Sequence, residues 1–374
     1  MPEELPSLNR DLLLIQDLPC GAGPGPETDA TVMTNPTAPL LQVKGLKTHF
    51  HTRRGVVRAV DGVDLEVQAG EILGLVGESG SGKSNVCLSI MRAVSGPAGR
   101  IVAGEVLLDG RDLLKMSDSE LRAVRGREIA MMLQDPTSSL NPVLTVGTQV
   151  AEAVNAHRTE SGSGVREAVV RALRRVQIPS AEQRQGDYPH QFSGGMRQRV
   201  MAAIAVACEP RVILADEPTT ALDVTIQAQF LDLMRGLRDT GIGILYVTHD
   251  LGVVAELCDR VAVMYAGKIV ETGTVEEIFA RPRHPYTAGL IASVPVLASG
   301  RGRLFQIQGV PPDPLDLPSG CKFAPRCFKA TSQCLEEDPP LGERPGGGAL
   351  RCWHPVEDIA ELETVEEGQA HAAN

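Results

Sequence analysis

The feature that most constrains this chain is a glycine-rich loop between an apolar strand pattern and a helical pattern. The loop reads Gly77-Glu78-Ser79-Gly80-Ser81-Gly82-Lys83-Ser84. It follows residues 72–76, a continuous apolar run typical of a buried parallel strand, and precedes residues 85–93, which we expect to be helical. Such a loop directs backbone N–H groups and the positive end of the helix at phosphate oxygens. The sequence therefore predicts a phosphate-binding loop in an α/β fold.

Two acidic residues at the end of a second apolar strand pattern complete a nucleotide-hydrolysing set. Lys83 can reach the β- and γ-phosphates, and the Ser84 hydroxyl can bind Mg²⁺. Residues 211–215 run into the adjacent carboxylates Asp216 and Glu217. Because successive side chains of a strand point to opposite sides, we expect Asp216 to hold Mg²⁺ and Glu217 to act as general base on water. No Asn-Lys-x-Asp motif that reads guanine follows, which favours ATP over GTP.

Strand patterns at residues 41–46, 60–67, 101–108, 242–248 and 260–265 alternate with helical segments, including an amphipathic helix over 165–176. This alternation predicts a mostly parallel sheet covered by helices on both sides. After residue 279 the chain is rich in Pro and Gly, and we expect a separate appendage there. The predicted organisation is a flexible leader (1–39), an ATPase domain (40–278), a cysteine-rich C-terminal region (279–356) and an acidic, disordered tail (357–374).

The segment Ser193-Gly194-Gly195-Met196 lies upstream of the Asp-Glu pair, and with it residues 41–275 resemble the ATP-binding cassette (ABC) transporter ATPases. The resemblance implies a RecA-like parallel sheet core, an antiparallel β subdomain and an α-helical signature subdomain at about 138–205. In that family two cassettes stack head to tail, so the Ser193 segment of one closes over the nucleotide on the phosphate-binding loop of the other. A helix that begins at this serine would direct a second anion site at the γ-phosphate.

Three shorter segments fit the same family. Gln134 resembles the Q-loop glutamine that senses Mg²⁺ and the attacking water, Asp223 resembles the D-loop residue at the dimer seam, and His249 resembles the switch histidine that contacts the γ-phosphate. The resemblance therefore implies catalytic roles for Glu217, His249 and Gln134.

The chain departs from the family pattern at two places. Phe192 and Met196 replace the usual Leu and Gln of the signature, which we expect to alter packing more than phosphate contact. The position where the family usually stacks adenine on an aromatic ring holds Arg54. Phe50, His51 or the guanidinium of Arg54 could serve instead, since arginine can stack on a base, and the sequence leaves this open.

The C-terminal region narrows the resemblance. Residues 283–290 read Arg-His-Pro-Tyr-Thr-Ala-Gly-Leu, and with residues 308–312 and 318–327 they resemble the oligopeptide/dipeptide importer ATPases. The implied protein is a peripheral ATPase on the cytoplasmic side of the cell membrane. It would work with two permease subunits, a second cassette (a copy of itself or a paralogue) and an extracytoplasmic solute-binding protein. Importers of nickel and other small solutes share these motifs, so the solute stays open.

Four cysteines of this region, Cys321, Cys327, Cys334 and Cys352, lack the tight pairs that zinc ribbons use. Members of the subfamily can carry a [4Fe–4S] cluster at such cysteines, and the resemblance implies one here, with zinc or unliganded thiols as alternatives. Its negative charge would be offset by three cations: Lys322, Arg326 and Arg351. The other cysteines (Cys20, Cys87, Cys208 and Cys258) are expected to act as small hydrophobic residues.

Charge and composition weigh against the competing classes. Of the net charge of −11, residues 1–40 contribute −5 and residues 357–374 contribute −6, so the remaining body is neutral. A neutral body with 3% aromatic residues favours neither a nucleic-acid partner nor a soluble ABC ATPase acting on nucleic acid or ribosomes. A kinase with a phosphate-binding loop would not need the Ser193 segment. No apolar stretch approaches the ~18 residues that span a bilayer.

Overall fold

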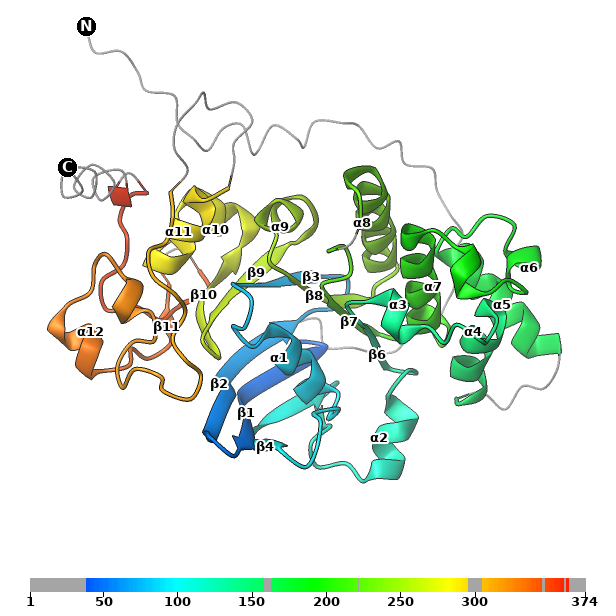
Figure 1. Cartoon of the computed structure of the whole chain (residues 1–374), viewed down its shortest axis with the longest axis horizontal. Coiled ribbons are helices and arrows are strands. Elements are labelled where there is room, and N and C mark those ends of the chain that lie inside the picture. Colours follow the sequence, from blue (N-terminus) through cyan, green and yellow to red (C-terminus); the bar gives the residue numbers. More distant parts are fainter. Residues whose placement is uncertain are drawn as a thin grey trace, which may run out of the picture.

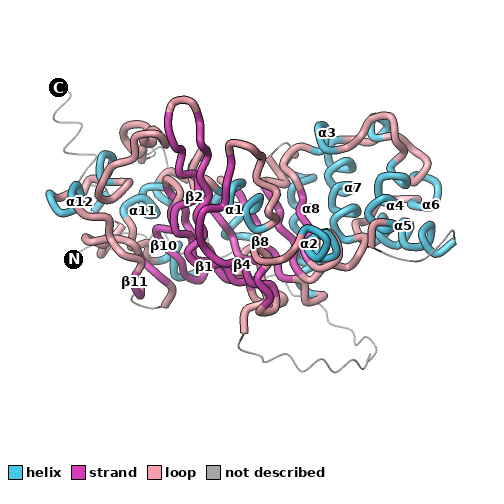
Figure 2. The backbone as a smooth tube through the Cα atoms, turned by 90° about the horizontal axis from the view of Figure 1, so that it is seen from below, coloured by secondary structure: helices cyan, strands magenta, loops and turns pink. Residues whose placement is uncertain are grey.

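The computed structural model describes residues 38–157, 163–220, 222–294, 305–344, 347–359 and 361–362. Almost all of the predicted leader, Cys20 included, lies outside the described residues, as does most of the predicted acidic tail. The chain is elongated, with a helical region at one end and the cysteine-rich region at the other (Figures 1 and 2).

The central layer is an eight-stranded sheet. Its order is β11 (Gly342–Glu343), β12 (Ala349–Leu350), β10 (Lys268–Thr274), β9 (Arg260–Tyr265), β3 (Ile72–Val76), β8 (Gly243–Thr248), β7 (Val212–Asp216) and β6 (Ile129–Met132). From β9 to β6 all neighbours pair in parallel. All residues of β3, β7 and β8 are buried, as their continuous apolar runs predict for a sheet covered on both faces.

A second, antiparallel sheet lies beside the first. It has the order β2 (Gly55–Val67), β1 (Leu41–Thr52), β4 (Gly99–Leu108) and β5 (Arg111–Asp112). Alternate residues such as Leu41, Val43 and Val106 point into a core shared with the apolar face of α1 (Lys83–Ile90). This sheet therefore supports the helix that follows the phosphate-binding loop.

Helices cover the central sheet and form the far end of the molecule (Figure 1). Around the sheet lie α2 (Asp118–Val124), α8 (Val224–Asp239), α9 (Leu251–Leu257) and α10 (Val275–Ala280). The helical end contains α3 (Pro136–Ser139), α4 (Val146–Asn155), α5 (Ser163–Arg175), α6 (Ala181–Arg184) and α7 (Gly194–Val206). Helix α5 buries Ala168, Val169, Ala172 and Leu173 against this group, as the amphipathic pattern predicts.

The cysteine-rich region is joined to the cassette instead of forming the separate appendage that its composition suggested. It contains α11 (Pro285–Ala292), α12 (Ser332–Glu336) and the two short strands β11 and β12. Strand β12 pairs antiparallel with β10, so residues 349–350 extend the central sheet at its edge. The composition of this region could not predict the pairing, because Glu271 and Leu350 lie about 80 residues apart and a two-residue strand carries no periodic signal.

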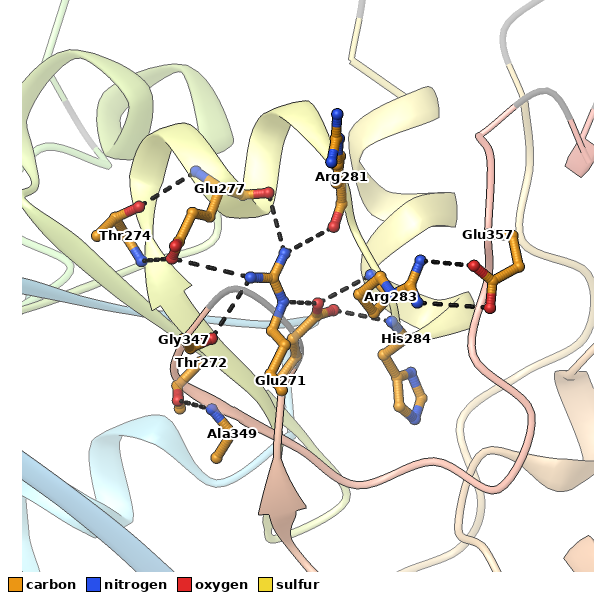
Figure 3. Close-up of polar contacts among 11 residues, drawn as sticks. Glu271, Thr272, Thr274, Glu277, Arg281, Arg283, His284, Gly347, Ala349 and Glu357 are labelled. Carbon is orange, nitrogen blue, oxygen red and sulfur yellow. Dashed lines mark hydrogen bonds and ion pairs between the residues drawn. The ribbon is translucent and has the colours of Figure 1, made fainter.

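A buried ion pair fastens this junction. Glu271 on β10 is fully buried and accepts hydrogen bonds from Arg344 Nε (3.0 Å), from the backbone N–H of Arg283 (2.8 Å) and from that of His284 (2.9 Å). Arg344 Nη2 donates to the carbonyls of Arg281 and Glu277, and Nη1 donates to that of Gly347 (Figure 3). Since both ions are surrounded by partners, the pair offsets its own desolvation cost.

We expect Arg344→Ala to lower the free energy of unfolding by about 3–5 kcal/mol, because Glu271 would remain buried without its cation. Arg174→Ala removes an exposed ion pair with Glu182 and should cost about 1 kcal/mol or less. Thermal and denaturant unfolding followed by circular dichroism measure both variants, and hydrogen exchange should show the added opening at β10 and β12. Equal stability of the two variants would contradict the assigned role of the junction.

Candidate nucleotide-binding site

The phosphate-binding loop is held close to its surroundings by backbone contact. Gly82 is the N-cap of α1 with φ 107°, and a Cβ placed there would lie 2.2 Å from the carbonyl oxygen of Ala59. Only glycine fits this approach. Within the loop, the buried Ser81 Oγ has no hydrogen-bond partner among the described residues. An orphaned hydroxyl beside the first turn of a helix is suited to a phosphate oxygen.

Lys83 is buried at the floor of the loop. Its Nζ donates hydrogen bonds to the carbonyls of Gly77 (2.8 Å) and Glu78 (3.1 Å) and lies 3.8 Å from Glu217 Oε1. Burial lowers the pKa of Lys83, while the neighbouring carboxylates, Glu217 first, act against this shift. The amine is therefore a cation that lacks full solvation, and an incoming polyphosphate would supply the missing counter-charge.

Ser84 and Asp216 present adjacent oxygens at the ends of α1 and β7. The Ser84 Oγ donates to Asp216 Oδ1 at 2.9 Å. Burial raises the pKa of Asp216, because a carboxylate removed from water is costly to ionise. A hydroxyl and a carboxylate are the oxygen ligands that Mg²⁺ accepts, so this pair fits the predicted metal. Gln134, the third predicted ligand, contacts Glu217 instead.

Glu217 is the centre of the predicted catalytic set. Its Oε2 accepts hydrogen bonds from Gln134 Nε2 (3.0 Å) and Thr220 Oγ1 (3.2 Å), and it lies 3.3 Å from His249 Nδ1. The backbone of Glu217 has φ 46°, a conformation that non-glycine residues seldom adopt, and its N–H donates to the carbonyl of Val247. The strained backbone turns this carboxylate toward Lys83, and Asp216 turns toward Ser84.

The Ser193 segment begins α7, apart from the phosphate-binding loop in both views (Figures 1 and 2). Gly195 is buried against α8, where a Cβ would lie 2.2 Å from Ile226 Cγ2. Gly194 is exposed, and a Cβ there would have no neighbour within 4 Å. The segment is therefore tightly packed against α8 at Gly195 and open to solvent at Gly194. Met196 lies 3.9 Å, through its sulfur, from Arg184 Nη1.

Asp223 caps a helix in this chain. Its Oδ1 accepts a hydrogen bond from the backbone N–H of Ile226 (3.0 Å) at the start of α8. The preceding residue of the predicted D-loop, Ala221, is outside the described residues. The single chain therefore shows a local capping role for Asp223, and a role at a dimer seam needs a second cassette.

Two residues of the cysteine-rich region hold the phosphate-binding loop, and the sequence reasoning missed them. Arg326 forms a bidentate ion pair with the carboxylate of Glu78 (2.7 and 3.0 Å), and the Tyr286 hydroxyl accepts the Glu78 backbone N–H (2.8 Å). Arg326 was expected to offset the charge of a cluster. Instead its guanidinium pairs with Glu78. The sequence could not predict this contact, because the two residues lie 248 positions apart in the chain and meet only in the folded structure.

The four predicted cysteine ligands line one pocket, together with Phe323 and His284. Burial raises the pKa of Cys327 and of Cys352 to about 12, so both thiols stay protonated at neutral pH without a metal. Within the described ranges, no three side chains of His, Cys, Asp or Glu are grouped so that they could hold a metal ion. This arrangement gives no support to a zinc site, nor does it by itself support a cluster.

The other two cations expected beside the cluster are also engaged elsewhere. Lys322 Nζ donates to backbone carbonyls, including that of Gly320, and Arg351 donates to the carbonyls of Ile269 and Pro339. Both side chains line a neighbouring pocket that also contains Cys321 and Asp338. Lys322 and Arg351 can still contribute to the electrostatic potential at the cysteines, whereas the charge of Arg326 is paired with Glu78.

Among the described helices, none is long and apolar enough to cross a lipid bilayer.

The geometry agrees with what comparison with known proteins finds. The family model of ABC transporters matches residues 60–220, and that of the oligopeptide/dipeptide transporter C-terminal region matches residues 270–334. A probable peptide ABC transporter ATP-binding protein, y4tR of Sinorhizobium fredii, is 50% identical over 331 residues, covering 88% of this chain and 99% of that protein. The oligopeptide transport ATP-binding protein AppD of Bacillus subtilis is 47% identical, covering 86% and 98%.

A solved structure shares the fold. The dimeric structure of a post-hydrolysis state of the ATP-binding cassette MJ0796, bound to ADP and Pi, superimposes with a TM-score of 0.56 at 28% identity, covering 63% of this chain and 98% of that chain. The parallel sheet, the antiparallel sheet and the helical region are thus those of an ABC cassette, as the resemblance implied. Together with the two family matches, this shows that the chain is a member of the ABC transporter ATP-binding proteins, in the group that carries the oligopeptide/dipeptide transporter C-terminal region.

Proposed function

We propose that this chain is the ATP-hydrolysing subunit that powers import of di- and oligopeptides through a membrane permease. The observation that carries the proposal is the convergence of Lys83, Gln134, Glu217 and His249 at the mouth of the phosphate-binding loop. Relatives with about half of their residues identical are named as peptide or oligopeptide transport ATP-binding proteins. The site supplies the chemistry, and the relatives supply the solute class.

The residues of the chain divide the hydrolysis between them. The loop and Lys83 hold the phosphates, and Ser84 and Asp216 are the residues that would hold Mg²⁺, which supplies charge neutralisation when bound. Gln134, which donates to Glu217 in this structure, would have to turn from that carboxylate to join them. Glu217 takes a proton from water as the water oxygen bonds to the γ-phosphorus and the bond to the bridging oxygen of ADP breaks. His249, 3.3 Å from the same carboxylate, steadies the γ-phosphate.

The second anion site comes from another cassette. Ser193 and Gly194 are exposed at the start of α7, and none of the described side chains fills the space beside Gly194. A solved cassette with this fold is dimeric. We infer that ATP is held between the loop of one cassette and the Ser193 segment of its mate. That dimer would lie under two permease subunits, on the cytoplasmic side of the membrane, and would receive solute from an extracytoplasmic binding protein.

We expect Glu217→Gln to reduce ATP turnover by about 100-fold or more, because a general base contributes roughly 10²–10⁴-fold. The variant should still bind ATP and accumulate as an ATP-bound cassette dimer, measured by size-exclusion chromatography with light scattering. Glu276→Gln, at an exposed position on α10, is the matched control and should leave turnover unchanged. Turnover at the wild-type rate in Glu217→Gln would rule out the assigned base.

The solute class is tested in vesicles that carry the permease subunits, the binding protein and both cassettes. We expect ATP-dependent accumulation of a radiolabelled dipeptide or oligopeptide, which the Glu217→Gln subunit abolishes. Accumulation of nickel without peptide would overturn the peptide assignment and leave the ATPase assignment intact. Stimulation of the isolated subunit by nucleic acid would instead favour a soluble ABC ATPase.

We further propose that Cys321, Cys327, Cys334 and Cys352 bind a [4Fe–4S] cluster. The support is the resemblance to subfamily members that carry a cluster at such cysteines, together with the position of all four in the lining of one pocket. A cluster is larger than a single ion and joins sulfurs that lie further apart. Since burial raises the pKa of Cys327 and of Cys352, their thiolates depend on the metal, and loading releases protons.

Anaerobically purified protein should therefore contain iron and sulfide in equal amounts and show the visible absorption of a cluster. Cys334→Ser should abolish both signals because one ligand is lost, and Cys208→Ser, in the helical region, should retain them. Zinc without sulfide, or four thiols without metal, would contradict the cluster.

A further inference from the structure

A partly open pocket of about 130 Å³ lies directly beside the phosphate-binding loop. Ser79 and Ser81 of the loop form one side of it, and Val57 and Arg58 of β2 form another. The pocket therefore continues from the place where the phosphates bind toward the place where the rest of a nucleotide must lie.

The remaining side of this pocket comes from the cysteine-rich region. Pro311, Pro312, Pro314 and Leu317 line it, and all belong to one irregular segment, residues 311–317. Proline rings and a leucine side chain make a flat, apolar surface with little conformational entropy to lose. Pro312 and Leu317 are half-buried, so the surface is part of the packed structure.

None of the three residues considered for adenine stacking lines this pocket. His51 and Arg54 are exposed on the β1–β2 hairpin, and the Phe50 ring packs next to Gly99. The aromatic Tyr265 does line the pocket, but its side chain is only 1% exposed and offers little surface to a purine ring. Another apolar surface is needed, because a purine ring left in water contributes little to binding.

Two contacts hold the segment, and the residues just before it, against the cassette. Arg326 donates from Nε to the carbonyl of Gln308 (3.0 Å) while its other nitrogens hold Glu78 of the phosphate-binding loop. Within the segment, the side chain of Leu315 lies against the start of β2, 3.4 Å from where a Cβ of Gly55 would stand. One arginine thus positions both the wall and the loop.

We propose that residues 311–317 form the apolar wall against which the purine ring of ATP packs, with Arg58 lining the same pocket from β2. This inference rests on the proposed ATPase function and assigns a binding role to a segment outside the cassette. The cysteine-rich region then completes the nucleotide site of its own chain, and Arg326 is a positioning residue for it.

The test compares Leu317→Ala and Pro312→Ala in the full-length protein with Val310→Ala, whose side chain is 81% exposed just before the segment. Isothermal titration measures the affinity for Mg²⁺-ATP and, separately, for Mg²⁺-tripolyphosphate, which has no purine. We expect each wall variant to weaken ATP binding by about tenfold, the size of losing part of one leucine contact. Tripolyphosphate affinity should stay within twofold in every variant.

The possible results distinguish a failure of the proposed purine wall from a failure of the proposed ATPase function. Unchanged ATP affinity in both wall variants, with normal ATP binding by the parent protein, overturns the wall and leaves the ATPase assignment standing. Equal weakening of ATP and tripolyphosphate also overturns it, because the variants would then act through the phosphate-binding loop. Absence of ATP binding by the parent protein would refute the proposed function itself.

Discussion

The parallel register of β3, β8 and β7 is the constraint on which the site depends. Val76 pairs with Thr248 and Asp216 pairs with Val247, so the three strands end at one edge of the sheet. A loop follows each strand: the glycine-rich loop follows β3, the loop with Glu217 follows β7, and the loop with His249 follows β8. The carboxyl ends of parallel strands open a crevice at that edge of the sheet. The strand register therefore brings together groups that lie about 170 residues apart in the chain.

The cysteine-rich region acts as part of the cassette through two arginines. Arg344 is paired with the fully buried Glu271 at the edge of the sheet, and Arg326 is paired with Glu78 in the phosphate-binding loop. Arg326 is adjacent to Cys327 and shares its short helix with the cysteine pocket. Arg326 therefore links the chain segment beside the cysteine pocket to the phosphate-binding loop.

Local chemistry predicted the strands and the loop well. The bounds of β3 and β9 match their apolar runs, and α1 begins two residues earlier than expected because Gly82 takes the cap position. The convergence of Gln134, Glu217 and His249 followed from the resemblance, and the contacts agree with it. Arg326 was placed beside the cysteines because they are neighbours in sequence, although its guanidinium turns to a carboxylate on another element.

What the sequence determined by itself was every feature that depends on neighbours along the chain: the loop, the buried strands, the paired acids and the helix that Ser193 caps. Only the tertiary structure decided which distant groups meet: Arg344 with Glu271, Arg326 with Glu78, and residues 311–317 with the nucleotide pocket. The physical reason is that side-chain periodicity records burial but not the identity of the partner. The counter-ion of a buried charge can lie on any element that the fold brings near it.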